Sequence, residues 1–215
     1  MILFGIRSPL IVEIEETLIR CGIAISAAVS VNDTPRMLDR SRIVDLRDFA
    51  APPGGRFIAC AFSPHRRGEL IEQARALGLE LAQALIDPTA ILPQSARIGE
   101  GSFINAGAVI GGATIIGEAV LVNRAASVGH HVLLGDRVSI GPGATLAGDI
   151  RVGENSVIGA GATVQPDVRI GANSIVSAGA VVRKNVPDNC IVAGNPAVAK
   201  PFKPRASSLQ ITGGE

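Results

Sequence analysis

The sequence predicts a mainly β protein, in which a parallel β-helix of hexapeptide repeats follows a small α/β domain of the βαβ type. Three observations predict this fold. Every sixth residue from Ile86 to Val182 is aliphatic, and nine of these residues are directly followed by glycine. The chain contains six Phe and no Trp or Tyr. Its core must therefore consist of Ile, Val, Leu and Ala, which suits thin, regular layers of short strands.

The six-residue repeat is unbroken over 17 positions: Ile86, Leu92, Ile98, Ile104, Ile110, Ile116, Val122, Val128, Leu134, Ile140, Leu146, Val152, Ile158, Val164, Ile170, Val176 and Val182. We expect each hexapeptide to form a short strand with the aliphatic side chain inward, followed by a corner. The small or β-branched residue four positions later also points inward. Glycine is expected after the aliphatic residue because the chain turns there and glycine tolerates positive φ. Three hexapeptides make one triangular coil, so residues 18 apart lie in neighbouring coils about 4.8 Å apart.

The first 80 residues alternate between strand and helix patterns. Residues 2–6, 23–31 and 56–62 predict strands, while Ser8-Pro9 and Ser63-Pro64 predict the starts of helices that end at Gly22 and Gly78. Residues 32–55 predict a loop. This alternation favours a parallel sheet. We therefore expect an α/β acceptor-binding domain at 1–84, a catalytic β-helix at 85–187, and a closing loop and tail at 188–215 that leave the β-helix.

Composition excludes several classes of protein. The net charge of +1 gives no electrostatic case for binding nucleic acid. No apolar run is long enough to span a membrane, and the first residues lack the basic segment of a secretion signal. The chain has three cysteines, Cys21, Cys60 and Cys190, which are far apart in the sequence. This number and spacing predict free thiols in a reducing compartment rather than a disulfide framework. We therefore expect a cytoplasmic protein.

Two adjacent histidines, His130 and His131, occupy outward positions of one hexapeptide. A neutral imidazole can act as a general base near neutral pH, although an ordinary exposed pair is the alternative. The spacing of 18 places Gly112 and Gly148 beside His130, which leaves open space on both sides. It places Asp149 beside His131, where the carboxylate can orient or stabilise an imidazole or simply be a solvated corner acid.

Four segments, 123–136, 141–149, 158–163 and 186–197, carry a resemblance to a known family. They read Asn-Arg-Ala-Ala-Ser-Val-Gly-His-His-Val-Leu-Leu-Gly-Asp, Gly-Pro-Gly-Ala-Thr-Leu-Ala-Gly-Asp, Ile-Gly-Ala-Gly-Ala-Thr, and Val-Pro-Asp ending in Gly-Asn-Pro-Ala. Together they resemble the sugar acetyltransferases of the NeuD/PglD type over nearly the whole chain. The resemblance implies a left-handed β-helix, a homotrimer, acetyl-CoA as acyl donor, and an amino or hydroxyl group of a sugar or nucleotide-linked sugar as acceptor.

The resemblance also implies roles for individual residues. His130 matches the general base of a direct transfer without a covalent acyl-enzyme. Asn123 matches a residue near the acceptor. Gly148, Ala160 and Ala178 match positions where the CoA arm runs in a groove between subunits, although each is equally compatible with an ordinary corner residue.

Two positions depart from the family pattern. His131 stands where the family often has an acid after the catalytic histidine, so either Asp149 takes over or the base is less strongly activated. The glycine-rich loop that helps to hold nucleotide-sugar phosphates reads Gly5-Ile-Arg-Ser-Pro here. Arg7, Ser8 and the start of the following helix remain candidates for binding an anion.

Three other functions are compatible with the fold: a non-catalytic scaffold, an acyltransferase for a non-sugar acceptor, and a metal-dependent hydratase of the carbonic anhydrase kind. The last carries its metal on three histidines, whereas this repeat has two histidines and no cysteine at ligand spacing, so no metal is predicted. Lys200, Lys203 and Arg205 are candidates for contacts to CoA phosphates, or are simply solvated.

Overall fold

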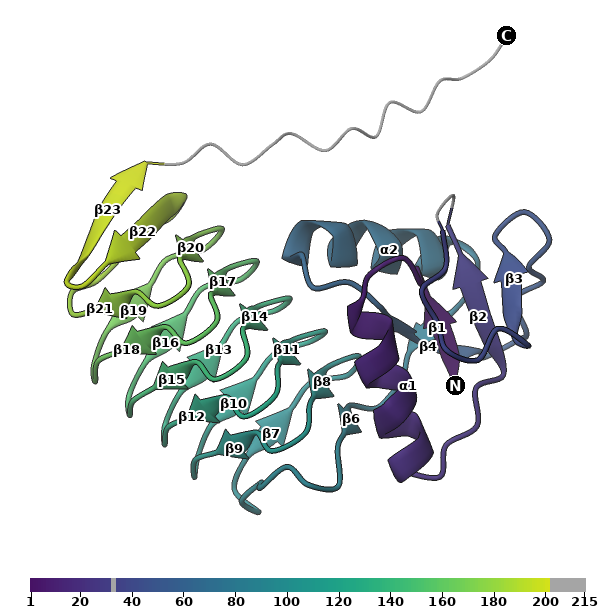
Figure 1. Ribbon diagram of the computed structural model, residues 1–215, viewed down its shortest axis with the longest axis horizontal. Helices are drawn as coiled ribbons and strands as arrows, with labels where there is room; N and C mark the ends of the chain where they lie inside the picture. The colour runs from purple at the N-terminus through teal and green to yellow at the C-terminus, as the bar shows by residue number, and fades with distance from the viewer. Residues whose placement is uncertain (32–33, 202–215) are drawn as a thin grey trace, which may run out of the picture.

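The computed structural model describes residues 1–31 and 34–201, which form an α/β domain and a three-sided β-helix (Figure 1). The α/β domain contains a five-stranded parallel sheet with strand order β3-β2-β1-β4-β5. Its elements are β1 (Ile2–Phe4), α1 (Leu10–Arg20), β2 (Ala27–Ser30), β3 (Ile43–Asp45), β4 (Arg56–Ala59), α2 (Pro64–Ala76) and β5 (Glu80–Leu81). The predicted fold class is confirmed. No helix in the described ranges has the length and apolar character of a membrane span.

Both helices begin where the sequence predicts. Helix α1 starts after Pro9 and buries Ile14 and Leu18. Helix α2 is capped by Ser63, whose side chain accepts a hydrogen bond from the backbone N–H of Arg66. Strand β3 was not expected, because its three half-buried residues lie in the segment predicted as a loop. It pairs only with β2 at the edge of the sheet, so tertiary pairing rather than a sequence pattern forms it.

The β-helix has three sides, each a parallel stack of two-residue strands. Side 1 contains β6 (Leu85–Ile86), β8 (Phe103–Ile104), β11 (Leu121–Val122), β14 (Ser139–Ile140), β17 (Val157–Ile158) and β20 (Ile175–Val176). Side 2 contains β9 (Val109–Ile110), β12 (Ser127–Val128), β15 (Thr145–Leu146), β18 (Thr163–Val164) and β21 (Val181–Val182). Side 3 contains β7 (Arg97–Ile98), β10 (Ile115–Ile116), β13 (Leu133–Leu134), β16 (Arg151–Val152) and β19 (Arg169–Ile170). The corners between sides are named 1–2, 2–3 and 3–1.

The register of the strands follows the predicted spacing of 18 residues. For example, Ile98, Ile116 and Leu134 pair in successive coils of side 3. The second residue of each strand points inward, and the small residue four positions later fills the corner, as the buried Ile104 and Ala108 illustrate. These side chains make one continuous aliphatic core. The corners outside this core carry the polar side chains.

Glycine follows the aliphatic residue for a different reason from the one predicted. None of these nine glycines has a positive φ. Instead, a Cβ at Gly99, Gly129 or Gly141 would lie 2.5–2.6 Å from backbone atoms of the next coil. The positive φ falls two residues later, where Ala113 and His131 adopt it. Glycine is therefore required by the close approach of stacked coils, and the turn itself tolerates larger residues.

The C-terminal segment does not leave the β-helix at residue 188. Strand β22 (Cys190–Gly194) adds another rung to side 1 by pairing with β20, and Val192 is buried in the core. Strand β23 (Ala197–Pro201) then pairs antiparallel to β22 and closes this end of side 1 (Figure 1). The predicted tail at 206–215, with Lys203 and Arg205, lies outside the described residues.

The α/β domain packs on side 1 and on corner 3–1. Outward residues of side 1, such as Phe103 and Leu121, share a buried cluster with α1. Arg67 of α2 is buried and donates hydrogen bonds to the carbonyl oxygens of Ala119 (2.7 Å) and Arg137 (2.6 Å) on the β-helix. Burial, with a smaller contribution from nearby Arg137, lowers the pKa of Arg67 to about 9. The guanidinium is thus a charged link between the two parts at neutral pH.

A buried carboxylate makes a second link. Asp87 follows β6 and accepts hydrogen bonds from Thr17 (2.9 Å) and Arg20 (2.8 Å) of α1. Burial opposes ionisation of Asp87, but hydrogen bonds from Thr89, Arg20 and Thr17 outweigh it and lower the pKa to about 2. The α/β domain is therefore fixed to side 1 by an ionised group at physiological pH.

Candidate functional site

The two adjacent histidines lie on corner 2–3, between β12 and β13. Their side chains are exposed, and the two Nδ1 atoms are 3.0 Å apart, with the ring planes at 84°. His131 has the positive φ of this corner position, 56°, which turns its side chain back toward that of His130. Nδ1 of His130 therefore contacts Nδ1 of His131, whereas Nε2 of His130 has no hydrogen-bond partner among the described residues.

The imidazole of His130 occupies space that glycine leaves in the next coil. A Cβ on Gly148 would lie 2.6 Å from Nε2 of His130. On the other side, a Cβ on Gly112 would meet nothing closer than Ser95 Oγ, at 3.5 Å. The backbone N–H of Asp149 donates to the carbonyl oxygen of His130 (3.0 Å), which holds the two coils in this register. Gly148 thus gives the ring room on a rigid corner.

Asp149 completes the cluster from the next coil. Its Oδ2 lies 3.8 Å from Nδ1 of His130, which is within ion-pair range but too long for a hydrogen bond. Within residues 1–31 and 34–201, His130, His131 and Asp149 have ligand atoms within 4.8 Å of one another. Imidazole and carboxylate are ligands that zinc accepts. The prediction that no metal binds rested on the histidines and cysteines and did not include the carboxylate of Asp149 as a third ligand.

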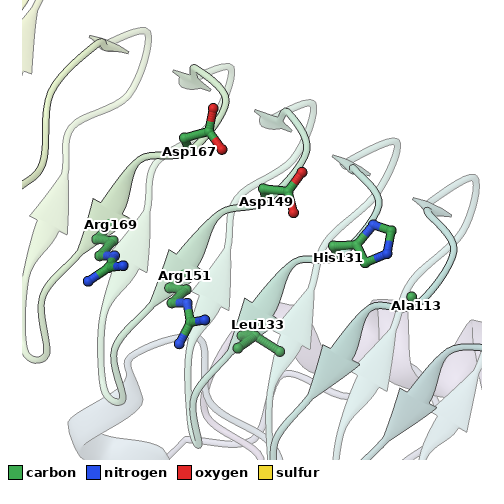
Figure 2. Close-up of a pocket in the computed structure, with 7 residues that line it drawn as sticks. All are labelled: Ala113, His131, Leu133, Asp149, Arg151, Asp167 and Arg169. Atoms are coloured by element: carbon green, nitrogen blue, oxygen red, sulfur yellow. The ribbon is translucent and has the colours of Figure 1, made fainter.

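A pocket of about 450 Å³ runs beside the cluster along side 3 (Figure 2). Two columns of side chains line it. The column on the corner consists of Ala113, His131, Asp149 and Asp167, and the column on the strands consists of Leu133, Arg151 and Arg169. No ion pair joins these carboxylates to these guanidinium groups within the described part of the chain. The pocket therefore offers both charges to a polar ligand.

A second pocket, of about 390 Å³, lies in the α/β domain. It is lined by the segments that follow β1, β2 and β4 and by α1 and α2 near their beginnings: Gly5, Arg7, Ser8, Pro9, Arg36, Cys60, Ala61, Phe62, Ser63, Arg66 and Leu70. The strand order reverses between β1 and β4, and ligands of open α/β sheets bind at such a point. The predicted Arg7 and Ser8 lie here. Arg36 and Arg66 were missed, because only the fold brings them beside Arg7.

The remaining predicted residues lie on corner 1–2. Asn123 is buried, and its Oδ1 accepts hydrogen bonds from Asn105 Nδ2 (3.1 Å) and from the backbone N–H of Arg124 (2.8 Å). Ala160 and Ala178 lie on the same corner, in the neighbouring column of Arg124 and Pro142, one and two coils beyond Pro142. One chain therefore brings His130, His131, Gly148 and Asp149 together. It does not bring Asn123, Ala160, Ala178, Arg7 or Ser8 to them.

Side 2, between these two corners, carries no charged outward residue on its strands. Its outward residues are Ile91, Val109, Ser127, Thr145, Thr163 and Val181. Ile91 is 64% exposed and Val109 is 40% exposed. Side 3 differs, since Arg97, Arg151 and Arg169 point outward there. Side 2 is thus the uncharged surface that separates corner 1–2 from corner 2–3.

One family model and several solved structures are similar to this chain. The family described as bacterial transferase hexapeptide (six repeats) matches residues 149–184. PerB from Caulobacter crescentus, solved with CoA and GDP-perosamine, is 33% identical over 93% of this chain and 95% of that chain, with a TM-score of 0.82. A mutant of the same organism's perosamine N-acetyltransferase is 32% identical, with a TM-score of 0.83 over 93% of this chain and 95% of that one.

A third solved protein also matches nearly the full length. The acetyltransferase domain of PglB from Neisseria gonorrhoeae, in complex with acetyl coenzyme A, is 32% identical over 94% of this chain and 98% of that chain, with a TM-score of 0.81. No curated protein sequence matches the chain.

Proposed function

Because this chain belongs to the hexapeptide-repeat sugar acetyltransferases, we propose that it transfers the acetyl group of acetyl-CoA to the amino group of a nucleotide-linked sugar. The family that the sequence segments resemble is thereby confirmed, and the enzyme is an acyltransferase. The observation that carries the proposed reaction is the position of His130. Its imidazole is exposed on a corner of the β-helix, where Nδ1 faces His131 and Asp149 and Nε2 has no hydrogen-bond partner among the described residues. Similarity to a perosamine N-acetyltransferase favours an amine over a hydroxyl as the acceptor.

In the proposed reaction His130 acts as general base. The acceptor amine attacks the thioester carbonyl carbon while Nε2 takes the proton that the amine loses. The tetrahedral intermediate collapses, the bond between carbon and sulfur breaks, and the thiolate of CoA leaves. The imidazolium then returns its proton to the sulfur. The acetyl group passes directly to the acceptor, so no acyl-enzyme forms.

His131 and Asp149 prepare His130 for this role. Nε2 can accept a proton only if Nδ1 carries the other hydrogen, and the partner 3.0 Å away on His131 accepts that hydrogen. When His130 becomes an imidazolium, the Asp149 carboxylate 3.8 Å away stabilises its charge. Asp149 thereby takes the part of the acid that often follows the base in this family.

A homotrimer would assemble the complete site. Burying the uncharged side 2 against a neighbour is favourable, and closed symmetry is the common way to do so. In a trimer packed through side 2, corner 2–3 of one subunit faces corner 1–2 of the next. Asn123, Ala160 and Ala178 would then line the groove opposite His130 and Gly148, as their predicted roles with acceptor and CoA require.

The nucleotide portion of the acceptor is proposed to bind in the pocket of the α/β domain. Arg7 and Arg36 have no ion-pair partner in the described part of the chain, and Arg66 pairs with Glu69 at 2.9 Å. The N-terminus of α1 faces the same pocket, and helix N-termini favour phosphate groups. Backbone amides and arginines thus replace the glycine-rich loop that this sequence lacks.

The test is acceptor-dependent release of CoA thiol from acetyl-CoA, with product mass, over a panel of nucleotide-linked amino and hydroxy sugars. We expect one acceptor to gain one acetyl group, and His130→Ala to reduce kcat by roughly 10²–10⁴-fold. His65→Ala is the matched control, because His65 is an exposed histidine of α2 that pairs with Glu69. Turnover that survives His130→Ala would refute the base. No turnover with any acceptor would favour a non-catalytic scaffold or a non-sugar acceptor.

A further inference from the structure

We propose that Arg67 and Ser139 are positioning residues for the pocket of the α/β domain. They hold two carbonyl groups of the segment between β4 and α2 against the β-helix. The N–H groups of Phe62 and Ser63 are thereby directed toward the phosphate groups of the acceptor. The proposal rests on the proposed acetyltransfer and adds residues outside the pocket that set its affinity for the nucleotide.

The guanidinium of Arg67 joins the segment between β4 and α2 to the β-helix. Its Nη1 donates hydrogen bonds to the carbonyl oxygens of Ala61 (2.6 Å) and Phe62 (3.0 Å). Its Nη2 donates to Oγ of Ser139 (2.9 Å) and to the carbonyl oxygen of Arg137 (2.6 Å). A guanidinium is planar and its donors have fixed directions. The buried Arg67 therefore fixes both carbonyl groups relative to the β-helix.

A hydroxyl group of side 1 contacts the same segment. Ser139 is the outward residue of β14 and is fully buried, and its Oγ donates to the carbonyl oxygen of Phe62 (2.6 Å). In the two preceding coils the outward residues are Phe103 and Leu121, which belong to the buried cluster shared with α1. Side 1 therefore changes at Ser139 from apolar packing to polar contact. The carbonyl oxygen of Phe62 accepts two hydrogen bonds, one from Ser139 and one from Arg67.

The N–H groups of the same two peptide units point away from Arg67. Neither peptide bond, Ala61–Phe62 or Phe62–Ser63, is cis. In a trans peptide unit the N–H is directed opposite to the carbonyl group. Because one nitrogen of Arg67 contacts both carbonyl oxygens, the N–H groups of Phe62 and Ser63 share the opposite side of the segment. Neither N–H has a hydrogen-bond partner among the described residues.

The pocket lies on that opposite side. Residues 60–63 line it, whereas Arg67 and Ser139 do not. Successive N–H groups on one side of a chain form a concave donor site that favours anions. The three arginines of the pocket surround the same space. A phosphate group there would therefore meet backbone donors and guanidinium groups together.

A second link between the two parts of the chain does not reach the pocket. Asp87 also joins the α/β domain to the β-helix, through Thr17 and Arg20 of α1. None of these three residues lines the pocket. A purely structural role of Arg67 predicts that loss of either link has the same effect on kinetics. A positioning role predicts that only loss of Arg67 or Ser139 weakens binding of the acceptor.

The test compares Ser139→Ala and Arg67→Met with the control Asp87→Asn, in kinetics that vary acceptor and acetyl-CoA separately. We expect the KM for the nucleotide-linked sugar to rise about threefold in Ser139→Ala and at least ~10-fold in Arg67→Met, as for lost hydrogen bonds to a charged group. The KM for acetyl-CoA and kcat should stay within about twofold. Asp87→Asn should lower the thermal unfolding temperature and change neither KM. Ser139→Ala retains Arg67, so it tests the proposal even if Arg67→Met does not fold.

Calorimetry with GDP and with UDP, which carry the diphosphate without an amino sugar, separates this proposal from the proposed function. Weaker binding of a nucleoside diphosphate in Ser139→Ala, with unchanged binding of CoA, would support the positioning role even if no acceptor is turned over. Three results would overturn it: wild-type protein that binds neither nucleoside diphosphate, unchanged binding in both Ser139→Ala and Arg67→Met, or equal weakening in Asp87→Asn.

Discussion

Replacing Gly148 with alanine tests whether the position of one imidazole determines activity. The added Cβ would lie 2.6 Å from Nε2 of His130, whereas ordinary contacts begin at 3.4 Å. The ring of His130 must therefore move by about 1 Å or change rotamer. Gly148 has no positive φ, so alanine is compatible with its backbone. The substitution is expected to displace the base and leave the β-helix intact.

The expected cost is large for activity and small for stability. A misplacement of about 1 Å in a catalytic group costs on the order of 10²-fold in rate. A change at an exposed corner alters the free energy of unfolding by about 0.5 kcal/mol or less. Gly112→Ala is the matched control, because Gly112 is the neighbour of His130 in the preceding coil and its Cβ would lie 3.5 Å from the nearest atom, Ser95 Oγ.

The assay is steady-state kinetics with acetyl-CoA, together with thermal unfolding and calorimetric binding of CoA. Gly148→Ala should lower kcat by roughly 10²-fold, while Gly112→Ala should stay within about twofold. The binding measurement separates loss of the base from obstruction of the CoA arm, since Gly148 is also a predicted contact of that arm. A Gly148→Ala enzyme that binds CoA normally and retains kcat within about threefold would refute the reasoning.

Three further predictions concern charge and metals. Asp149→Asn should lower kcat about two- to fivefold, as loss of an exposed ion pair does, and an unchanged kcat in the same kinetics would show that the carboxylate is only solvated. Asp87→Asn should reduce the free energy of unfolding at pH 7 by about 2 kcal/mol, because the pKa of Asp87 falls from 3.8 to about 2 on folding. This contribution is present above pH 4 and is lost as the pH falls toward 2. Urea titrations should therefore show that the difference in free energy of unfolding between wild type and variant disappears in that range. Equal free energies of unfolding at pH 7 would contradict this prediction. Dialysis against EDTA should leave activity unchanged, whereas added Zn²⁺ should inhibit by occupying His130, His131 and Asp149; metal assays would detect a bound ion, and loss of activity with EDTA would refute the metal-free reaction.

The corner that carries His130 was largely accessible from the sequence because the β-helix has a fixed register. Once the repeat was counted, adding 18 to His130 led to Gly148, and adding 18 to His131 led to Asp149. Backbone hydrogen bonds between coils enforce this register, so residues 18 apart in the sequence are neighbours in the structure. Asn123 was predicted from the family resemblance alone, and no sequence pattern revealed that its side chain is buried and hydrogen-bonded to Asn105.

Features that depend on packing between distant segments were not accessible. Arg66 and Arg36 join Arg7 only because the sheet brings three loops to one edge. The buried role of Arg67 depends on docking against corner 3–1, and nothing in its neighbourhood along the chain distinguishes it from an exposed helical arginine. The glycine pattern was recognised but explained wrongly, because a sequence does not distinguish a need for positive φ from a need for close approach.

The triangular cross-section restricts how such a chain can lengthen. Inserting six residues within the repeat preserves the core pattern but rotates everything beyond it by one side, so residues of corner 2–3 would move to another corner. Inserting 18 residues restores every side and only lifts the later coils by about 4.8 Å. Segments before and after His130 can therefore be exchanged between relatives only in whole coils. Each added coil would leave the imidazole of His130 unchanged and lengthen the corner that carries it by one step of about 4.8 Å.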